Sequence, residues 1–315
     1  MPALIAVLLF IVGVILAIWA TERLLEGLVS LAAALRLSAF AIGAILSGFE
    51  AENVAVGLAA GGSGTASTAS VALGTVFGGA IFLMCVALGL GALLFPLEVR
   101  LPRRILLVFA ASPVLAGLGL IAPVTPRWAG ALLLVAFVAA IAYLTLLSRH
   151  QNFLMSEEVE EAQEKPRPWW IALGLTIVGI VVIGVGGELV AQGAERIVAS
   201  FGVPALLMGM VVAPAAIEIE EVFRQAVPSR RGRHDVSAGN LVGTLLYFVL
   251  FNLGLIALIT PVQVAPLVRQ FDWPFLIVVT WIATAFLWRG RVGRGAGLFL
   301  LALYVVYIVG HVVLR

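Results

Sequence analysis

The sequence predicts an all-α membrane protein with ten transmembrane helices, arranged as two inverted-topology repeats of five helices each. The first observation behind this prediction is the composition, because 62% of the 315 residues are hydrophobic and only 11% are charged. A water-facing surface needs a larger share of charge, so lipid must surround most of the chain. The second observation is a series of long apolar runs, and the third is an internal repeat.

The predicted helices are apolar runs separated by short polar connections. These runs lack the strict alternation of membrane β-strands, and only helices or closed barrels satisfy their backbone groups in hydrocarbon. The first run has no basic segment before it, so we interpret it as a span and not as a cleaved signal peptide. In chain order, the predicted spans are residues 3–34, 38–60, 70–95, 104–122, 128–147, 169–200, 203–225, 236–260, 272–288 and 295–314.

One polar stretch, residues 149–168, divides the chain into two halves. We expect a first five-helix repeat over residues 1–148, a linker over 149–168 and a second five-helix repeat over 169–315. We interpret the linker as a solvated segment; the alternative, a regulatory cation-binding loop, lacks the spacing of an EF-hand. Its acidic residues are Glu157, Glu158, Glu160, Glu161 and Glu164.

Basic residues are distributed unevenly between the two sides that ten spans define. The connections after the odd-numbered spans contain 14 of the 19 Lys and Arg. Because Lys and Arg accumulate on the cytoplasmic side, these connections and the linker are predicted to be cytoplasmic and both termini external, in a plasma or inner membrane. The 14 residues are Arg36, Arg100, Arg103, Arg104, Arg149, Lys165, Arg167, Arg224, Arg230, Arg231, Arg233, Arg289, Arg291 and Arg294.

The two halves are related in sequence. Val71 to Gly78 recurs 165 residues later as Val236 to Gly243, and each copy holds two glycines four residues apart. Five spans is an odd number, so a second copy would enter the membrane from the opposite face, as in many secondary transporters. Chance matching of glycines is the alternative. Further matches at separations of 165 or 166 residues are Gly89/Gly254, Leu90/Leu255, Pro96/Pro261, Val99/Val264, Glu22/Glu188, Gly27/Gly193 and Gly43/Gly209.

Five glutamates interrupt the apolar runs of the second and seventh predicted spans. A charge at bilayer depth costs about 2.5–3.5 kcal/mol on insertion scales. With Arg224 assigned to the connection after the seventh span, the sequence places no basic partner beside these acids. We therefore expect them to be protonated, bound to cations or exposed to water, and each case indicates a pathway for cations or protons. The five are Glu50, Glu52, Glu218, Glu220 and Glu221.

Helix breakers precede both acidic groups. Gly48 and Pro214 each lie shortly before the glutamates, and a break there would free backbone carbonyls for an all-oxygen site of the kind that hard cations prefer. In a regular helix, Glu218 would share a face with Glu221 but not with Glu220. Glu50 and Glu52 would likewise diverge, so some of these acids are expected to be interface residues unless the helices are broken.

Two further acids, Glu22 and Glu188, match between the halves. Each begins a more polar stretch of the first or sixth span. A place near a tapering span end, with Arg23 as a partner of Glu22, and a role along an access path are both consistent with the sequence.

The sequence excludes several kinds of site. The single cysteine, Cys85, excludes an internal disulfide framework and a cysteine-based zinc site. The three histidines, His150, His234 and His311, are scattered and argue against a haem or a histidine-ligated metal. There is no zinc-binding His-Glu pair, Ser/Lys dyad or nucleotide-binding loop, so we expect neither an enzyme nor a resident cofactor, and no nucleic-acid partner.

Several motifs resemble those of a known family. Leu35 to Gly43 and Phe201 to Gly209 resemble its lead-in, Gly209 to Glu221 keeps its spacing from glycine to signature glutamate, and Gly239 to Thr244 resembles its G-N-x-x-G-S step. The family is the Ca²⁺/cation antiporters, which include the Na⁺/Ca²⁺ exchangers. The resemblance covers nearly the whole chain and implies two inverted five-helix halves around a cation site.

The chain also departs from the family pattern. The G-T-S-x-P part of the signature is absent, and the family's Asn or Asp after G-S falls on Ala80 and Leu245. Counting from Gly43 with the family spacing places the signature glutamate of the first half at Ala55, which is not an acid. We therefore take Glu52, about one helical turn earlier, as the counterpart of Glu221. These two would be the main carboxylates. Other candidate ligands or proton carriers are Glu218, Glu220, Glu50, Asn53, Asn240, Thr75, Thr244 and Asn252.

The expected function is exchange of Ca²⁺, or another divalent cation, for Na⁺ or H⁺ by alternating access, with the cation bound near the membrane midplane. The cations are the transported substrate. A monovalent Na⁺/H⁺ exchanger is the first alternative, and a non-transporting membrane sensor or enzyme on the same scaffold is the second. The sequence leaves open the ion, the stoichiometry and the oligomeric state.

Overall fold

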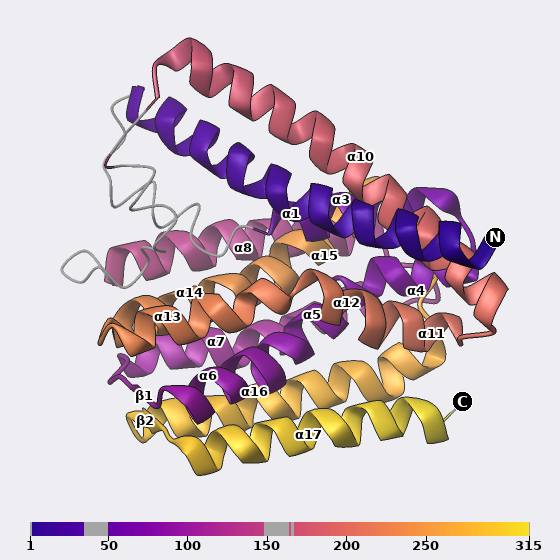
Figure 1. Ribbon diagram of the computed structural model, residues 1–315. Coiled ribbons are helices and arrows are strands. Elements are labelled where there is room, and N and C mark those ends of the chain that lie inside the picture. Colours follow the sequence, from indigo (N-terminus) through magenta and orange to yellow (C-terminus); the bar gives the residue numbers. More distant parts are fainter. Residues whose placement is uncertain (1, 35–49, 148–163, 165–166, 315) are drawn as a thin grey trace.

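The computed structural model describes residues 2–34, 50–147, 164 and 167–314, and almost all of the regular structure in these ranges is helical (Figure 1). Within these ranges, eight helices are long and apolar enough to cross a membrane. The chain is therefore an integral membrane protein. The eight candidate spans are Ala3–Leu31, Phe77–Leu94, Arg103–Leu120, Arg127–Leu147, Trp169–Phe201, His234–Ile259, Val268–Trp288 and Arg294–Val313.

The elements follow one another in two series, in which short π-helical or 3₁₀ segments (η) interrupt or extend several helices. The first series is α1 (Pro2–Ala34), α3 (Ala51–Ser63), α4 (Ala66–Gly74), α5 (Phe77–Phe82), η1 (Leu83–Ala87), α6 (Leu88–Leu94), β1 (Leu97–Glu98), α7 (Arg103–Ala116), η2 (Gly117–Leu120) and α8 (Arg127–Leu147). The second is α10 (Trp169–Phe201), α11 (Ala205–Leu207), η3 (Met208–Val212), α12 (Ala213–Ile217), α13 (Ile219–Arg230), α14 (His234–Leu246), η4 (Tyr247–Asn252), α15 (Leu253–Ile259), η5 (Val268–Asp272), α16 (Trp273–Trp288), β2 (Arg291–Val292) and α17 (Arg294–Val313).

The described helices match eight of the ten predicted spans. The second predicted span, 38–60, begins in residues 35–49, which lie outside the described ranges together with nearly all of the linker 149–168. The seventh, 203–225, is broken: a shorter apolar stretch over Ala205–Ile217 is followed by α13, which continues to Arg230. The predicted third span also starts earlier, at Ala66, and is interrupted after Gly74.

Local sequence signals explain several helix ends. Thr65 caps α4 and forms a reciprocal capping box with Thr68, which satisfies two backbone donors at the start of the helix. Gly202 ends α10 in the left-handed conformation, with φ of 64°, and its N–H donates to the carbonyl of Val198. Gly290 has φ of 79° in the turn between α16 and β2.

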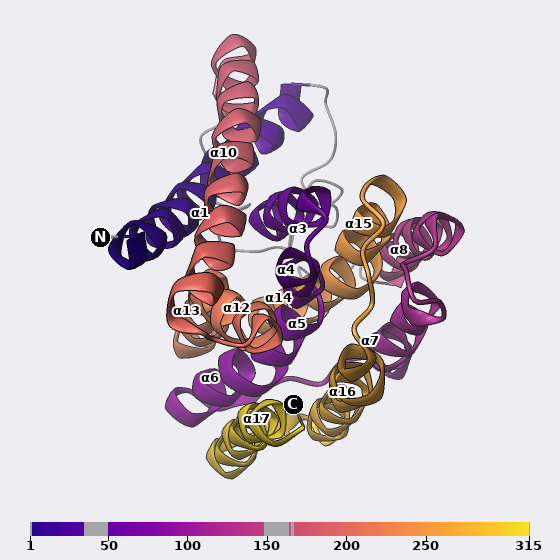
Figure 2. The same cartoon turned by 90° about the vertical axis from the view of Figure 1, so that its right-hand side faces the viewer.

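The long helices α1 and α10 lie together on one side of the molecule, where α10 packs against α3 (Figure 2). Glycines make their close approach possible, since a Cβ on Gly13 would collide with the backbone of Val190, and one on Gly179 with the backbone of Leu24. Small residues at such crossings are typical of helix contacts in lipid. These two helices therefore pack closely against each other beside the remaining helices.

Glycines also set the contact between the third and seventh spans. A Cβ on Gly74 would collide with the carbonyl of Gly209, and one on Gly78 with Met210 and Pro214. These contacts hold α12 next to α5, so the spaced glycines of the repeat bring the third span against a span that carries carboxylates.

A buried polar group lies apart from the glutamates. Tyr307 donates to Oδ1 of Asp272 at 2.7 Å, and Nε2 of His311 lies 2.6 Å from the same oxygen. All three side chains are buried between η5 and α17. Because buried polar groups cost free energy unless they are paired, this group fixes the start of α16 against the end of α17.

The glycine contact predicts the effect of a larger side chain. Gly78→Val would force α5 away from α12, and overpacking of this kind costs about 1–3 kcal/mol. We expect a lower thermal unfolding midpoint in detergent micelles. Gly62→Val is the matched control, because a Cβ at Gly62 meets no atom within 4 Å. Equal midpoints for the two variants would contradict the contact.

Candidate cation-binding site

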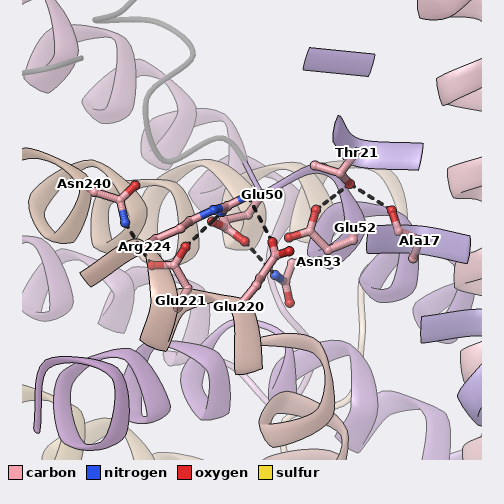
Figure 3. A network of polar contacts seen from close by, with 9 residues as sticks. All are labelled: Ala17, Thr21, Glu50, Glu52, Asn53, Glu220, Glu221, Arg224 and Asn240. Carbon is pink, nitrogen blue, oxygen red and sulfur yellow. Dashed lines mark hydrogen bonds and ion pairs between the residues drawn. The ribbon is translucent and has the colours of Figure 1, made fainter. Parts of the chain in front are cut away.

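The glutamates of the two halves meet where α3 begins and where α12 joins α13 (Figure 3). Four of them, Glu50, Glu52, Glu218 and Glu221, are at most 1% exposed. The fifth, Glu220, keeps 21% of its side chain exposed. The structure therefore brings together acids that lie almost 170 residues apart in the sequence.

The backbone at Glu50 explains why both acids of the first half reach the cluster. Glu50 precedes α3, with φ of −111° and ψ of 67°, so it is not held at helical spacing from Glu52. The expected divergence holds for a regular helix and does not apply here, because Glu50 lies before the helix begins. An oxygen each from Glu50, Glu52 and Glu220 lies within 4.8 Å of the others.

A break in the helical structure lies at Glu218. Its φ of −85° and ψ of 6° end α12 and begin α13, after its N–H has bonded to the carbonyl of Pro214 at 2.8 Å. The N–H of Glu221 then donates to the carbonyl of Glu218 at 3.0 Å, a tighter turn than that of an α-helix. The break turns the start of α13 so that Glu220 and Glu221 both approach the cluster.

Arg224 lies inside this cluster. Its Nη1 is 3.0 Å from Glu50 and 2.8 Å from Glu221, and its Nη2 is 3.0 Å from Glu220. Only 13% of its side chain is exposed. The placement of Arg224 in a connection, and the expectation of no basic partner, were therefore wrong. The physical reason is that α13 continues to Arg230, which puts Arg224 on the helix face of the acids.

Other polar side chains tie neighbouring helices to the cluster. Thr21 of α1 donates to Oε2 of Glu52 at 2.6 Å, and Asn240 of α14 donates to Oε2 of Glu221 at 3.0 Å. Within the first half, Nδ2 of Asn53 donates to Oε2 of Glu50 at 3.3 Å. The site thus takes side chains from α1, α3, α13 and α14 (Figure 3).

Several buried oxygens in the cluster accept no hydrogen bond of good geometry from the described residues. These are Oε1 of Glu52, Oδ1 of Asn53 and both carboxylate oxygens of Glu218. Buried acceptors normally have a donor or a cation as partner. Carboxylate and amide oxygens are the ligands of Ca²⁺ and other hard cations, so the donor set suits such an ion.

The other residues predicted from the sequence make different contacts from those of the glutamate cluster. The hydroxyl of Thr75 donates to the carbonyl of Ala72 at 2.9 Å, and that of Thr244 has no hydrogen-bond partner among the described residues. Both amide atoms of Asn252, in η4, are buried and also lack a described partner. Glu22 and Glu188 are exposed. Arg23 pairs with Glu26 at 3.2 Å, not with Glu22.

Two residues of the cluster were not identified from the sequence. Arg224 follows Glu220 and Glu221 by four and three residues, a spacing that favours ion pairs on a helix and was available as a signal. Thr21 precedes the matched acid Glu22, but no local pattern connects it with Glu52. Its role depends on the approach of α1 to α3.

Comparison with known proteins agrees with this fold. The family model described as sodium/calcium exchanger protein matches residues 5–146 and 171–313. Inner membrane protein YrbG of Escherichia coli is 27% identical over 315 residues, which cover 97% of this chain and 96% of that protein. The putative antiporter CaxA of Alkalimonas amylolytica is 27% identical over 270 residues, 82% of each chain.

A solved structure has the same fold. The sodium-calcium exchanger NCX_Mj, soaked with 10 mM Na⁺ and 10 mM Sr²⁺, superposes with a TM-score of 0.63 at 21% identity, covering 99% of both chains. At this identity the likeness shows the fold alone.

The ion pairs of Arg224 predict a large loss of stability on its removal. In Arg224→Gln the carboxylates of Glu50 and Glu221 would stay buried without their cationic partner. Breaking a buried pair in this way costs about 3–5 kcal/mol. Thermal unfolding in detergent measures the loss. Arg23→Gln, which breaks a pair whose arginine is 40% exposed, should cost about 1 kcal/mol or less. Equal losses would contradict the assigned pairing.

Proposed function

The chain belongs to the sodium/calcium exchanger protein family, and on that premise we propose that it exchanges Ca²⁺, or another divalent cation, for Na⁺ or H⁺. The family and the relative named as a putative antiporter support cation antiport in general. The observation that carries the proposal for this chain is the buried cluster of glutamates from both halves. Glu52 and Glu221 are its main carboxylates, and Glu218, Glu220, Glu50, Asn53 and Asn240 complete it.

The charge of the cluster explains why transport is an exchange. Five glutamates face one arginine, so the cluster carries excess negative charge whenever more than one of the acids is ionised. An uncompensated charge is costly in a dry core, so the site reorients only when cations or protons neutralise it. A cation leaving on one side must then be replaced by another ion, which couples the two fluxes.

In this scheme the guanidinium of Arg224 occupies part of the site as a positive charge that belongs to the protein itself. It pairs with Glu50 and Glu220, two of the three acids whose oxygens lie within 4.8 Å of one another. A cation bound there competes with the guanidinium for these oxygens. The unpartnered oxygens of Glu52, Asn53 and Glu218 provide the first contacts, and fuller coordination requires Arg224 to withdraw from Glu50.

We further propose the complete architecture of ten spans in two inverted repeats, residues 1–148 and 169–315, joined by a cytoplasmic linker over 149–168. Contacts between the halves support it, because they occur in reciprocal pairs. Gly13 meets Val190 and Gly179 meets Leu24, with Gly13 and Gly179 separated by 166 residues, as are Leu24 and Val190. The two stretches matched by the family model also fall within the two halves.

The same reciprocity appears at the ends of other spans. Gly89 and Gly297 approach each other, as do Gly254 and Gly130. The backbone pairing between the halves is also reciprocal. β1 pairs with β2 through Glu98 and Arg291, and an isolated bridge joins Gln263 and Val124. Glu98 corresponds to Gln263 in the repeat that the sequence suggests.

Alternating access would move the α1–α10 pair against the remaining helices. These helices lie together at one side of the molecule (Figure 2), and Thr21 of α1 contacts Glu52 directly. Movement of α1 therefore changes the surroundings of a site carboxylate. The excess of basic residues in the connections after the odd-numbered spans supports a cytoplasmic location for these connections and external termini, and removing Arg224 from the count leaves that bias intact.

A monovalent Na⁺/H⁺ exchanger is the second candidate. The pairing of Arg224 with three of the acids favours it, because a fixed positive charge lowers the charge that the transported ion must supply. Purified protein in liposomes separates the candidates: Ca²⁺-dependent Na⁺ or H⁺ flux supports the first, and Na⁺-dependent H⁺ flux without Ca²⁺ flux supports the second. Cation binding without any flux would indicate a sensor.

Carboxamide variants test the site. Glu52→Gln and Glu221→Gln keep the size of the side chain but remove a charge that balances the ion, so each should lower exchange in proteoliposomes at least about a hundredfold, the effect of about 2.7 kcal/mol. Glu98→Gln is the control, since Glu98 is 58% exposed and pairs with Arg291. Unchanged flux in Glu221→Gln, with normal insertion, would refute the assignment.

Competition by Arg224 predicts a gain in cation binding when it is removed. In Arg224→Gln, a saturating divalent cation should raise the unfolding midpoint more than it does in the unsubstituted protein, because the cation no longer displaces an ion pair. Arg224→Lys, which keeps the charge, should restore the smaller shift. Equal shifts in all three proteins would show that Arg224 and the cation do not compete.

A further inference from the structure

A small pocket lies at the end of the molecule where α7 begins and α16 ends. The antiparallel pair β1–β2 brings these ends together, and Val99 donates to the carbonyl of Gly290 at 3.1 Å. The pocket encloses about 210 Å³. Since one water needs about 10–15 Å³ of such volume, the pocket has room for a phosphate group.

Three arginines line this pocket: Arg100, Arg103 and Arg289. No carboxylate lines it among the described residues, and the neighbouring Glu98 pairs with Arg291 at 3.2 Å. Two other described arginines, Arg23 and Arg167, pair with a carboxylate, that of Glu26, at 3.2 and 2.6 Å. A concave site with three guanidinium groups and no acid is suited to an anion with several oxygens.

The backbone at the start of α7 adds to the positive charge of the arginines. Arg103 is the first residue of α7, a helix of 14 residues, and Pro102 caps it without a side-chain hydrogen bond. The first N–H groups of a helix have no intrahelical acceptor, and the helix dipole favours negative charge there. Phosphate groups commonly bind at such positions when side-chain donors are also present.

The rest of the lining suggests where the anion comes from. Trp288 is 49% exposed, and the guanidinium of Arg103 lies 5.4 Å from its ring centroid. Exposed tryptophans beside arginines are typical of the membrane–water interface. Leu101, Leu106 and Leu287 form the apolar part of the wall. A molecule with a charged phosphate and an apolar body fits both parts.

We propose that this pocket binds the phosphate group of an anionic molecule at the membrane surface, with Arg100 and Arg289 as the principal ligands and Arg103 held over Trp288. The positive-inside bias requires arginines on this side of the membrane but not a pocket that gathers them. The site lies apart from the glutamate cluster and does not depend on the proposed ion exchange.

A matched pair of double variants tests the pocket in the full-length protein. Arg100→Gln with Arg289→Gln removes two lining charges. Arg104→Gln with Arg294→Gln removes two exposed charges from the same end that do not line it. Binding is measured by native mass spectrometry of detergent-solubilised protein with short-chain phosphatidylglycerol, short-chain phosphatidylcholine or inorganic phosphate, after confirming equal unfolding midpoints without ligand.

We expect phosphatidylglycerol to bind the unsubstituted protein about tenfold more tightly than phosphatidylcholine does. The pocket variant should lose about tenfold or more, as expected for charge-assisted hydrogen bonds, and the control variant less than about threefold. Competition by millimolar inorganic phosphate would identify a soluble phosphate compound as the source, and no competition would identify the lipid. Equal losses in both variants, or no loss in the pocket variant, would overturn the proposal.

Discussion

The guanidinium of Arg224 lies within 3.0 Å of carboxylate oxygens from Glu50, Glu220 and Glu221, in a part of the protein that water barely reaches. Glutamates at bilayer depth are tolerated only when their charge is balanced. One arginine balances part of it and leaves the oxygens of Glu52 and Glu218 for another positive charge. The surrounding helices hold these glutamates together although their negative charge exceeds the positive charge of the single arginine.

Two structural features bring the charges together. Glu50 lies just before α3 begins and Glu218 lies at the break between α12 and α13, so these acids are not held at regular helical spacing and their side chains approach the others. Glycines then bring the helices close, because Gly74 and Gly78 allow the third span to lie against the backbone of the seventh. Larger side chains at these positions would separate the helices that carry the site.

Hydropathy alone predicts the eight long spans, because lipid imposes an apolar run of fixed length on any helix that crosses it. It also places four buried glutamates, since an acid inside such a run needs a function or a partner. The prediction that Arg224 lies in a connection was wrong, because the hydropathy of the sequence falls before α13 ends. Thr21 is not predictable from local sequence, since only the approach of α1 to α3 gives it a partner in Glu52.

The central claim is that these buried oxygens hold a transported cation, and a structure of the protein soaked with Sr²⁺ tests it most directly. The account predicts density between α3 and α13, in direct contact with oxygens of Glu52, Glu218 and Glu221, at distances slightly longer than the roughly 2.3–2.6 Å of Ca²⁺ because Sr²⁺ is larger. Arg224 would then have moved away from Glu50. Absence of density there at saturating Sr²⁺, with the contacts of Arg224 unchanged, would contradict it.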